Sequence, residues 1–348
     1  MQHGAPDRLA RYAEVRVLHL EPTSRCQAAC PMCGRNQDGG KLHDGLTLEE
    51  ISGAQFRDWF PADFLTQLDR VFLCGNFGEP ILARDCLEIL AHCRAASAGL
   101  KLGLNTNGSA RGPEFWQALA RLGVRVTFGI DGTTDASHRR YRRGTDLDRI
   151  LANAVIFIKA GGQAVWDFIV FRHNEHEVAQ ARALAGTLGF AEFRVKPTAR
   201  FGAPWFDVRD ESGAVVDRLE PSLGHHEPPG APRRPDIRAR RIDCDVARQR
   251  SVYVSAGGMV FPCCFLGQRL IDIPAPDRPE GPPESRQAEI LSFAAVLDRI
   301  GARNLDLRST DLRTILDLHL PAFERHWHAG AGRLLTCAKI CGTHELCG

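Results

Sequence analysis

Short apolar runs alternate with amphipathic segments from Val15 to about Lys196, and this alternation restricts the possible fold more than any other feature. The strand-like runs cover residues 15–20, 71–73, 100–104, 124–130, 164–171 and 193–196. The helical patterns between them cover about 48–60, 83–97, 113–122, 147–160 and 175–188. Repeated strand-then-helix units predict parallel strands joined by right-handed crossovers. We therefore expect an α/β fold with a partial (β/α)6 barrel over residues 12–202.

The pattern changes after this region. Residues 203–243 are rich in proline, arginine and glycine and show no clear period, which is typical of a linker or a covering loop. In residues 244–348, Ser251–Ser255, Gly257-Gly258 and Met259–Phe261 read as a β-hairpin. Helical patterns follow at about 287–301 and 309–327. We expect this last third to form a small cysteine-rich domain.

Charge and hydropathy narrow the class of protein. The net charge of +2 gives no indication of a nucleic-acid or membrane-surface partner. No apolar run approaches the length of a membrane span, and the polar N-terminus lacks the apolar core of a signal peptide. These features predict a cytoplasmic protein that binds neither nucleic acid nor membrane. In a reducing compartment, its 12 cysteines are expected to bind metal or take part in chemistry rather than form disulfides.

The first cysteine group directly follows the first predicted strand. Cys26, Cys30 and Cys33 have the spacing Cys-x3-Cys-x2-Cys, and three such thiolates can hold a [4Fe-4S] cluster. Three ligands leave one iron open for a substrate or cofactor. Zinc is the alternative, but structural zinc favours four ligands in paired spacings. Cys74, Cys86 and Cys93 lie in or beside apolar segments and read as buried small side chains.

This arrangement resembles the radical S-adenosylmethionine (radical SAM) superfamily, and the likeness continues along the chain. Phe77-Gly78-Glu79 stands where the family has Gly-Gly-Glu, which meets the methionyl amino group at the end of strand two. The segments that resemble the ends of strands three, four and five are 104–108, 129–132 and 171–174. The resemblance implies that SAM is bound by Phe77, Gly78, Glu79, Asn105, Asn107, Asp131, Arg172 and Asn174.

The resemblance also implies a chemistry. A [4Fe-4S] cluster with an open iron reductively cleaves SAM, and the resulting 5′-deoxyadenosyl radical removes hydrogen from an unactivated carbon. The cofactor supplies this reactivity, while the protein orients the substrate and excludes competing reactions. We therefore expect an oxidoreductase that acts on a small molecule or a peptide. Its electron donor is expected to be a protein such as flavodoxin or ferredoxin.

The C-terminal cysteines form a second group. Cys244 is followed by thirteen residues, Gly258, four residues and Cys263, and the chain ends with Cys337-x3-Cys341-x5-Cys347-Gly. This pattern resembles the auxiliary-cluster domains called SPASM and twitch. The resemblance implies one auxiliary [4Fe-4S] cluster, with two clusters or a structural zinc as alternatives. Which four cysteines bind it stays open, although Cys244 and Cys263 fit the pattern best.

Three further residues are candidates for catalysis. Cys264 adjoins a predicted ligand and is a second-cluster ligand, a hydrogen-atom donor or a buried thiol. Arg139 belongs to a basic run, 138–143, that reads either as a solvated face or as a clamp for a carboxylate or phosphate. Lys196 stands at the end of the sixth predicted strand, where ligands of such sheets gather.

Several reactions agree with this set of residues. Oxidation of an unactivated carbon is the favoured reaction, since an auxiliary cluster can accept the second electron. An epimerase that uses Cys264 as its hydrogen donor and a peptide cross-linking enzyme are the enzymatic alternatives. An iron–sulfur electron carrier or a zinc-stabilised binding protein is the non-enzymatic one, and the open iron of the first site argues against it.

Overall fold

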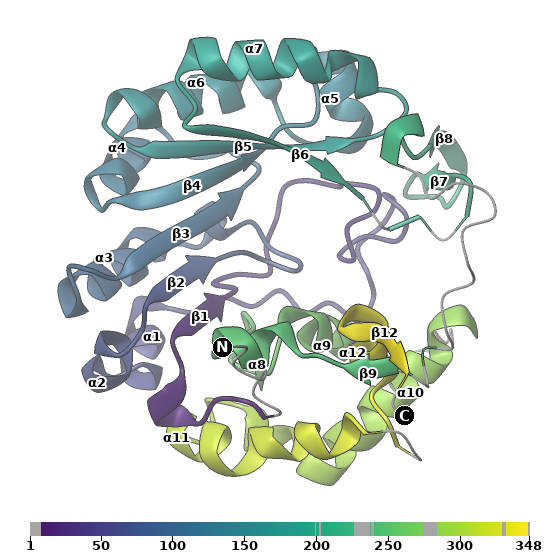
Figure 1. Ribbon diagram of the computed structural model, residues 1–348. Helices are drawn as coiled ribbons and strands as arrows, with labels where there is room; N and C mark the ends of the chain where they lie inside the picture. Colours follow the sequence, from purple (N-terminus) through teal and green to yellow (C-terminus); the bar gives the residue numbers. More distant parts are fainter. Residues whose placement is uncertain are drawn as a thin grey trace.

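A curved sheet of eight strands organises the structure (Figure 1). The computed structural model describes residues 8–198, 200–201, 203–225, 237, 240–273, 284–328 and 332–346. The strand order is β11-β10-β1-β2-β3-β4-β5-β6, and all neighbours run parallel except β10 and β11. The strands are β1 (Val17–Leu20), β2 (Arg70–Leu73), β3 (Lys101–Thr106), β4 (Val124–Gly129), β5 (Gln163–Val170), β6 (Glu192–Pro197), β10 (Ser251–Val254) and β11 (Val260–Phe261). The predicted partial barrel of the α/β class is confirmed.

Helices cover the convex side of this sheet (Figure 1). They are α1 (Gly53–Trp59), α2 (Ala62–Thr66), α3 (Cys86–Ala96), α4 (Pro113–Arg121), α5 (Asp135–Tyr141), α6 (Leu147–Lys159) and α7 (Val178–Leu188). Local signals set several of their ends. The Asp146 carboxylate accepts the Arg149 N–H at 3.0 Å and caps α6, and α7 ends at Gly189, whose φ is 87°. The predicted helices are all found, whereas α2 and α5 were not predicted.

The C-terminal third continues the same sheet. β10 pairs with β1 in parallel, with Val17 opposite Ser251 and Leu20 opposite Val254. β10 and β11 form the predicted hairpin. The remaining elements are α8 (Asp245–Gln249), α9 (Cys264–Gln268), α10 (Glu284–Ile300), α11 (Leu312–Thr314), α12 (Leu335–Ile340) and a two-stranded sheet of β9 (Arg240–Ile242) and β12 (Gly342–Leu346). The division of the chain into domains stays a prediction. The larger of two hydrophobic clusters in the described residues contains side chains from Leu9 to Cys337, and the smaller one lies around Cys30 and Val208.

The predicted helix at 309–327 is present in altered form. After α11 it continues as a π-helical turn, Ile315–His319, and a 3₁₀ segment, Leu320–His326. Pro321 lies at the start of that 3₁₀ segment, and its missing N–H does not permit a regular α-helical ladder there.

The segment interpreted as a linker contains regular structure. β7 (Phe206–Arg209) and β8 (Val215–Leu219) form an antiparallel hairpin, so the absence of a pattern in this region was misleading. Val208 and Leu219 point inward and are buried, while Val215 and Val216 are exposed. This mixture hides the alternation on which a sequence prediction of strands depends. Residues 226–236 and 238–239 lie outside the described part of the chain.

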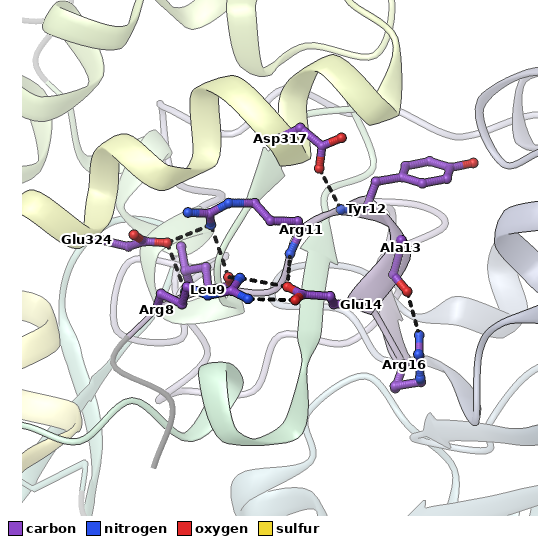
Figure 2. Close-up of polar contacts among 9 residues, drawn as sticks. All are labelled: Arg8, Leu9, Arg11, Tyr12, Ala13, Glu14, Arg16, Asp317 and Glu324. Carbon is purple, nitrogen blue, oxygen red and sulfur yellow. Dashed lines mark hydrogen bonds and ion pairs between the residues drawn. The ribbon is translucent and has the colours of Figure 1, made fainter. Parts of the chain in front are cut away.

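The N-terminal segment is fastened to the C-terminal helical region (Figure 2). Glu324 accepts hydrogen bonds from the Leu9 N–H at 2.9 Å and from Arg11 at 2.8 Å. Asp317 accepts the Tyr12 N–H at 2.8 Å. These contacts hold the approach to β1 against residues about 300 positions later, which fixes the strand that leads into the cysteine loop. No helix in the described ranges has the length and apolar character that a membrane crossing requires.

Candidate active site

The carboxyl ends of β1 and β2 meet at a buried carboxylate. Glu21, directly after β1, is 1% exposed and accepts the N–H groups of Phe77 at 2.7 Å and Gly78 at 3.0 Å through one oxygen. Its other oxygen accepts the Tyr253 hydroxyl at 2.5 Å. Burial raises the pKa of Glu21. Sequence reasoning missed Glu21, although a glutamate directly after an apolar strand is a signal that could have found it.

The turn after β2 requires glycine because it approaches the loop after β1 very closely. A Cβ on Gly78 would lie 1.6 Å from the Thr23 carbonyl oxygen, and one on Gly75 would lie 2.2 Å from the Gly78 carbonyl oxygen. Arg35 also links the loop after β1 to the turn after β2. Its guanidinium donates to the Ser24 carbonyl at 2.7 Å and to the Phe77 carbonyl at 2.5 Å. The conformation of the turn after β2 is therefore constrained by close backbone contacts that only glycine permits. We call this turn the cradle.

Glu79 lies at the end of this turn with its carboxylate buried, at 4% exposure. It accepts the Thr106 hydroxyl at 2.6 Å and the Asn107 N–H at 2.7 Å. Burial raises the pKa of Glu79 to about 7, while these two hydrogen bonds act in the opposite direction. A cationic amine that displaced the remaining solvent would stabilise the ionised carboxylate.

The three predicted cluster ligands lie on one loop across the concave side of the sheet (Figure 1). Burial raises the pKa of Cys26 to about 12 and that of Cys30 to about 11. The thiols lie close enough that ionisation of Cys30 opposes that of Cys26, and ionisation of Cys33 opposes that of Cys30. Metal binding would remove this repulsion, because it replaces the thiol protons by cationic iron.

A positive side chain lies beside these thiols. Arg142 donates to the Asp131 carboxylate at 2.5 Å, and its charge lowers the pKa of Cys30 against the effect of burial. Asp131 is fully buried and also accepts the Ile169 N–H at 2.6 Å. Burial raises the pKa of Asp131. The sequence identified the basic run but not which of its arginines turns inward.

The other predicted SAM-binding residues occupy different environments. Asn107 is buried, accepts the Gln27 amide at 2.9 Å and lies 3.9 Å from the Cys26 sulfur. Asn105 is more exposed and donates to the Cys74 sulfur at 3.4 Å. Asn174 is buried and fully engaged with backbone, since it accepts the Phe171 N–H at 2.7 Å and donates to the Asp131 and Ile169 carbonyls at 3.0 Å.

Three polar candidates have side chains that are about half exposed and lie beside acidic residues. Arg172 is 48% exposed and pairs with Glu175. Arg139 is 57% exposed and pairs with Asp135 on its own helix at 2.9 Å. Lys196 is 53% exposed, 3.6 Å from Asp167. The roles assigned to Arg172, Arg139 and Lys196 stay predictions.

The second cysteine group converges from three separate segments. A pocket of about 350 Å³ is lined by Cys244, Cys263, Cys264, Cys337 and Cys341, together with His19, Phe72 and Tyr253 of the sheet. Cys244 precedes α8, Cys263 precedes α9, and Cys337 and Cys341 lie on and after α12. The pairing of β9 with β12 brings the ends of this group together, and the Asp243 N–H donates to the Cys341 carbonyl at 2.9 Å.

The thiols of the second cysteine group shift one another's pKa, as expected of neighbouring groups. A hydrogen bond between Cys244 and Cys341 lowers the pKa of Cys341 and raises the pKa of Cys244. Burial raises the pKa of Cys337, and ionised Cys263 and Cys341 raise it further. The Thr336 hydroxyl, which lines the same pocket, is buried without a hydrogen-bond partner. Cys347 lies outside the described residues.

Four thiols around one pocket match the donor set of a cysteine-ligated [4Fe-4S] cluster. Within the described ranges, no group of three His, Cys, Asp or Glu side chains surrounds the position of a single metal ion.

Cys264 lines the pocket as well, and burial raises its pKa to about 12, with a further contribution from Cys74. Cys264 therefore lies between the auxiliary cysteines and the turn after β2.

The partial barrel and the cysteine loop after β1 form the arrangement expected of a SAM-dependent radical enzyme, and comparison with known proteins supports this class. The model of the radical SAM superfamily matches residues 20–185. Residues 20–185, just under half of the chain, thus belong to the radical SAM superfamily, whose enzymes use a [4Fe-4S] cluster and SAM. The expectation of an enzyme is confirmed, and the alternatives of an electron carrier or a zinc-stabilised binding protein are not retained.

This chain matches only part of the length of its individual relatives. The chain is 28% identical over 260 residues to a PqqA peptide cyclase of Xanthomonas campestris, covering 70% of this chain and 66% of the relative. It is 27% identical over 190 residues to an AdoMet-dependent heme synthase of Methanosarcina barkeri, covering 53% and 52%. The chain thus spans between about half and two thirds of the length of these relatives.

A solved structure supports the fold. Streptococcus suis SuiB bound to precursor peptide SuiA matches 73% of this chain and 60% of its own, with a TM-score of 0.50 and 13% identity.

Proposed function

We propose that this enzyme oxidises an unactivated carbon of a peptide or small molecule and passes the second electron to an auxiliary [4Fe-4S] cluster. The ligands of that cluster would be Cys244, Cys263, Cys337 and Cys341. The observation that carries the proposal is one pocket that is lined by all four of these cysteines and by Tyr253. An enzyme that only isomerises its substrate has no need of an electron acceptor at this place.

The protein's own groups would bind and orient the reactants. Cys26, Cys30 and Cys33 would hold the first cluster, and the buried Glu79 carboxylate would pair with the methionyl ammonium of SAM. When bound and reduced, these cofactors supply a 5′-deoxyadenosyl radical. Glu21 and Arg35 keep the turn after β2 fixed, so that the ammonium meets preorganised acceptors.

The overall reaction balances in two steps. The substrate carbon first loses a hydrogen atom to the 5′-carbon of the adenosyl group, which leaves as 5′-deoxyadenosine. The substrate then loses one electron to the auxiliary cluster and one proton to solvent or a nearby base. One SAM is consumed for each product and also gives methionine. A donor of the flavodoxin or ferredoxin type would supply the one electron that reduces the first cluster, and the auxiliary cluster would pass its electron to the oxidised form of that donor.

The substrate class rests on the relatives. A peptide is supported by the likeness to PqqA peptide cyclase, which extends over 70% of this chain. Small molecules remain in the proposal, because similarity extends to a GTP 3′,8-cyclase of Rhodopseudomonas palustris at 30% identity over 50% of the chain. Peptide cross-linking is the corresponding alternative reaction.

Iron counting tests the auxiliary cluster. Anaerobic reconstitution is expected to give about eight irons per chain, and Cys244→Ala/Cys341→Ala is expected to keep about four. Cys93→Ala is the matched control, since that thiol is buried in α3 among apolar side chains and should leave the count unchanged. About twelve irons in the wild type would indicate two auxiliary clusters. About four irons with one zinc would overturn the proposal.

Deuterated water separates oxidation from epimerisation. A hydrogen-donating thiol exchanges with solvent, so an epimerase that used Cys264 would place one deuterium on carbon and leave the product otherwise at substrate mass. We expect a product lighter by two hydrogens without carbon-bound deuterium, and Cys264→Ala that keeps most turnover. Stoichiometric deuterium in the product, lost with turnover in Cys264→Ala, would favour the epimerase.

A further inference from the structure

The short helix α9 lies between the two cysteine sites. Its N-cap is Cys263, one of the proposed auxiliary ligands. On the other side it packs against the first cysteine loop, where a Cβ on Gly34 would lie 2.4 Å from the Gln268 amide nitrogen. Just beyond α9, Asp272 lies 3.7 Å from His43 of the same loop. A displacement of α9 would therefore move residues at both the auxiliary cysteine pocket and the first cysteine loop.

Asn76 contacts both sides of this arrangement. Its carbonyl oxygen is 3.9 Å from the Cys33 sulfur. Its side-chain amide donates one hydrogen to the Cys264 carbonyl at 2.8 Å and the other to the Tyr253 hydroxyl at 3.1 Å. An amide NH₂ has two hydrogens, so both are engaged with the C-terminal third of the chain.

The following residues of the turn are held by the same network. The Tyr253 hydroxyl accepts from Asn76 and donates to Glu21 at 2.5 Å. Glu21 in turn accepts the N–H groups of Phe77 and Gly78. A Cβ on Gly267 would lie 2.3 Å from the Tyr253 ring, so α9 also packs directly on this tyrosine. The turn thus has its conformation fixed partly by α9 and β10.

We infer that Asn76 is a positioning residue that couples the auxiliary cluster to SAM binding. Ligation of Cys263 fixes the start of α9 and with it the Cys264 carbonyl, which holds the Asn76 amide and orients the turn that receives SAM. Because such coupling is reciprocal, SAM binding also favours the cluster-bound arrangement of α9. The inference rests on the auxiliary cluster of the proposed function.

A double-mutant cycle on SAM affinity measures the coupling without turnover. The oxidised protein is titrated with SAM by calorimetry as wild type, Cys244→Ala/Cys341→Ala, Asn76→Leu and the combined variant. We expect loss of the auxiliary cluster to raise the SAM Kd about tenfold when Asn76 is present. With leucine at position 76, we expect loss of the cluster to change the Kd less than twofold.

A spectroscopic reading distinguishes positioning from general damage. In the wild type, SAM is expected to shift the auxiliary cluster's EPR signal or reduction potential, and this shift should disappear in Asn76→Leu. Asn304→Leu is the matched control, because that amide donates to the Ile300 carbonyl at 2.6 Å in another part of the fold. If Asn76→Leu does not fold, the smaller Asn76→Ala replaces it.

The outcomes separate the inference from the proposed function. Eight irons with a tenfold effect of cluster loss in both Asn76 backgrounds would overturn the coupling and leave the proposed function intact. Four irons in the wild type would overturn both. An Asn304→Leu variant that abolished the SAM-induced shift would also refute a specific role for Asn76.

Discussion

Replacing Gly78 by alanine tests whether the turn after β2 binds SAM as proposed. The added Cβ would lie 1.6 Å from the Thr23 carbonyl oxygen, while real Cβ contacts are essentially never under 3.0 Å. The turn must therefore move by about 1.4 Å, the difference between these two distances. The contact is with backbone, so no side chain can rotate away to relieve it.

The displacement has a predictable effect on catalysis. A shift of about 1 Å in a positioning group can lower a rate about 100-fold, and the Phe77 and Gly78 N–H groups would leave Glu21. We expect Gly78→Ala to lower 5′-deoxyadenosine formation at least 100-fold and to weaken SAM binding. Overpacking of this kind costs about 1–3 kcal/mol of stability, so the protein should still fold with lower Tm.

The assay combines iron content, Tm, SAM Kd and 5′-deoxyadenosine formation with dithionite as reductant. Iron should stay at the wild-type level, because the cysteine side chains are unchanged. Gly99→Ala is the control, since a Cβ there meets nothing within 4 Å, and it should behave as wild type. A Gly78→Ala enzyme with wild-type SAM cleavage would refute the cradle.

Two further predictions concern the same site. Changing Cys26, Cys30 and Cys33 together to alanine should remove about four irons and abolish 5′-deoxyadenosine formation; continued cleavage of SAM by that variant would contradict the assignment of the first cluster. Because burial raises the pKa of Glu79 to about 7, the carboxylate becomes neutral as pH falls below 7 and loses its attraction for the SAM ammonium. Wild-type SAM affinity should therefore fall up to about tenfold per pH unit below 7, whereas Glu79→Gln should bind weakly at every pH, and titration calorimetry between pH 5.5 and 8.5 checks both.

The barrel could be predicted because its signals are local. Each of the six predicted strands is a short segment bounded by turn residues, and apolar side chains at alternate positions of a strand face the same side of the sheet. Trp166 and Phe168 of β5 are examples, since both are fully buried. The Cys-x3-Cys-x2-Cys loop was equally local, and its position after β1 needed no knowledge of distant contacts.

The choice of residues within a motif could not be made in the same way. Arg139 and Arg142 belong to one basic run, yet Arg139 stays on the outer surface of α5 with Asp135, while Arg142 at the end of that helix reaches Asp131. A helix of seven residues ends between them, and the direction of the chain after its end decides which arginine turns inward. A local sequence pattern does not record this direction.

The relation between the two cysteine groups depends on one long-range pairing. β10 lies beside β1 in parallel, so Tyr253 and Glu21 meet although they are 232 positions apart in the chain. Tyr253 reads in the sequence only as an apolar hairpin residue, and Asn76 only as one residue of a turn. Once β10 is placed beside β1, the same tyrosine forms a wall of the auxiliary pocket and a hydrogen-bond partner of the turn after β2. In the proposed function, electron transfer and SAM binding would share a structural support, because β10, which lies between Cys244 and Cys263 in the chain, also holds the turn after β2 through Tyr253.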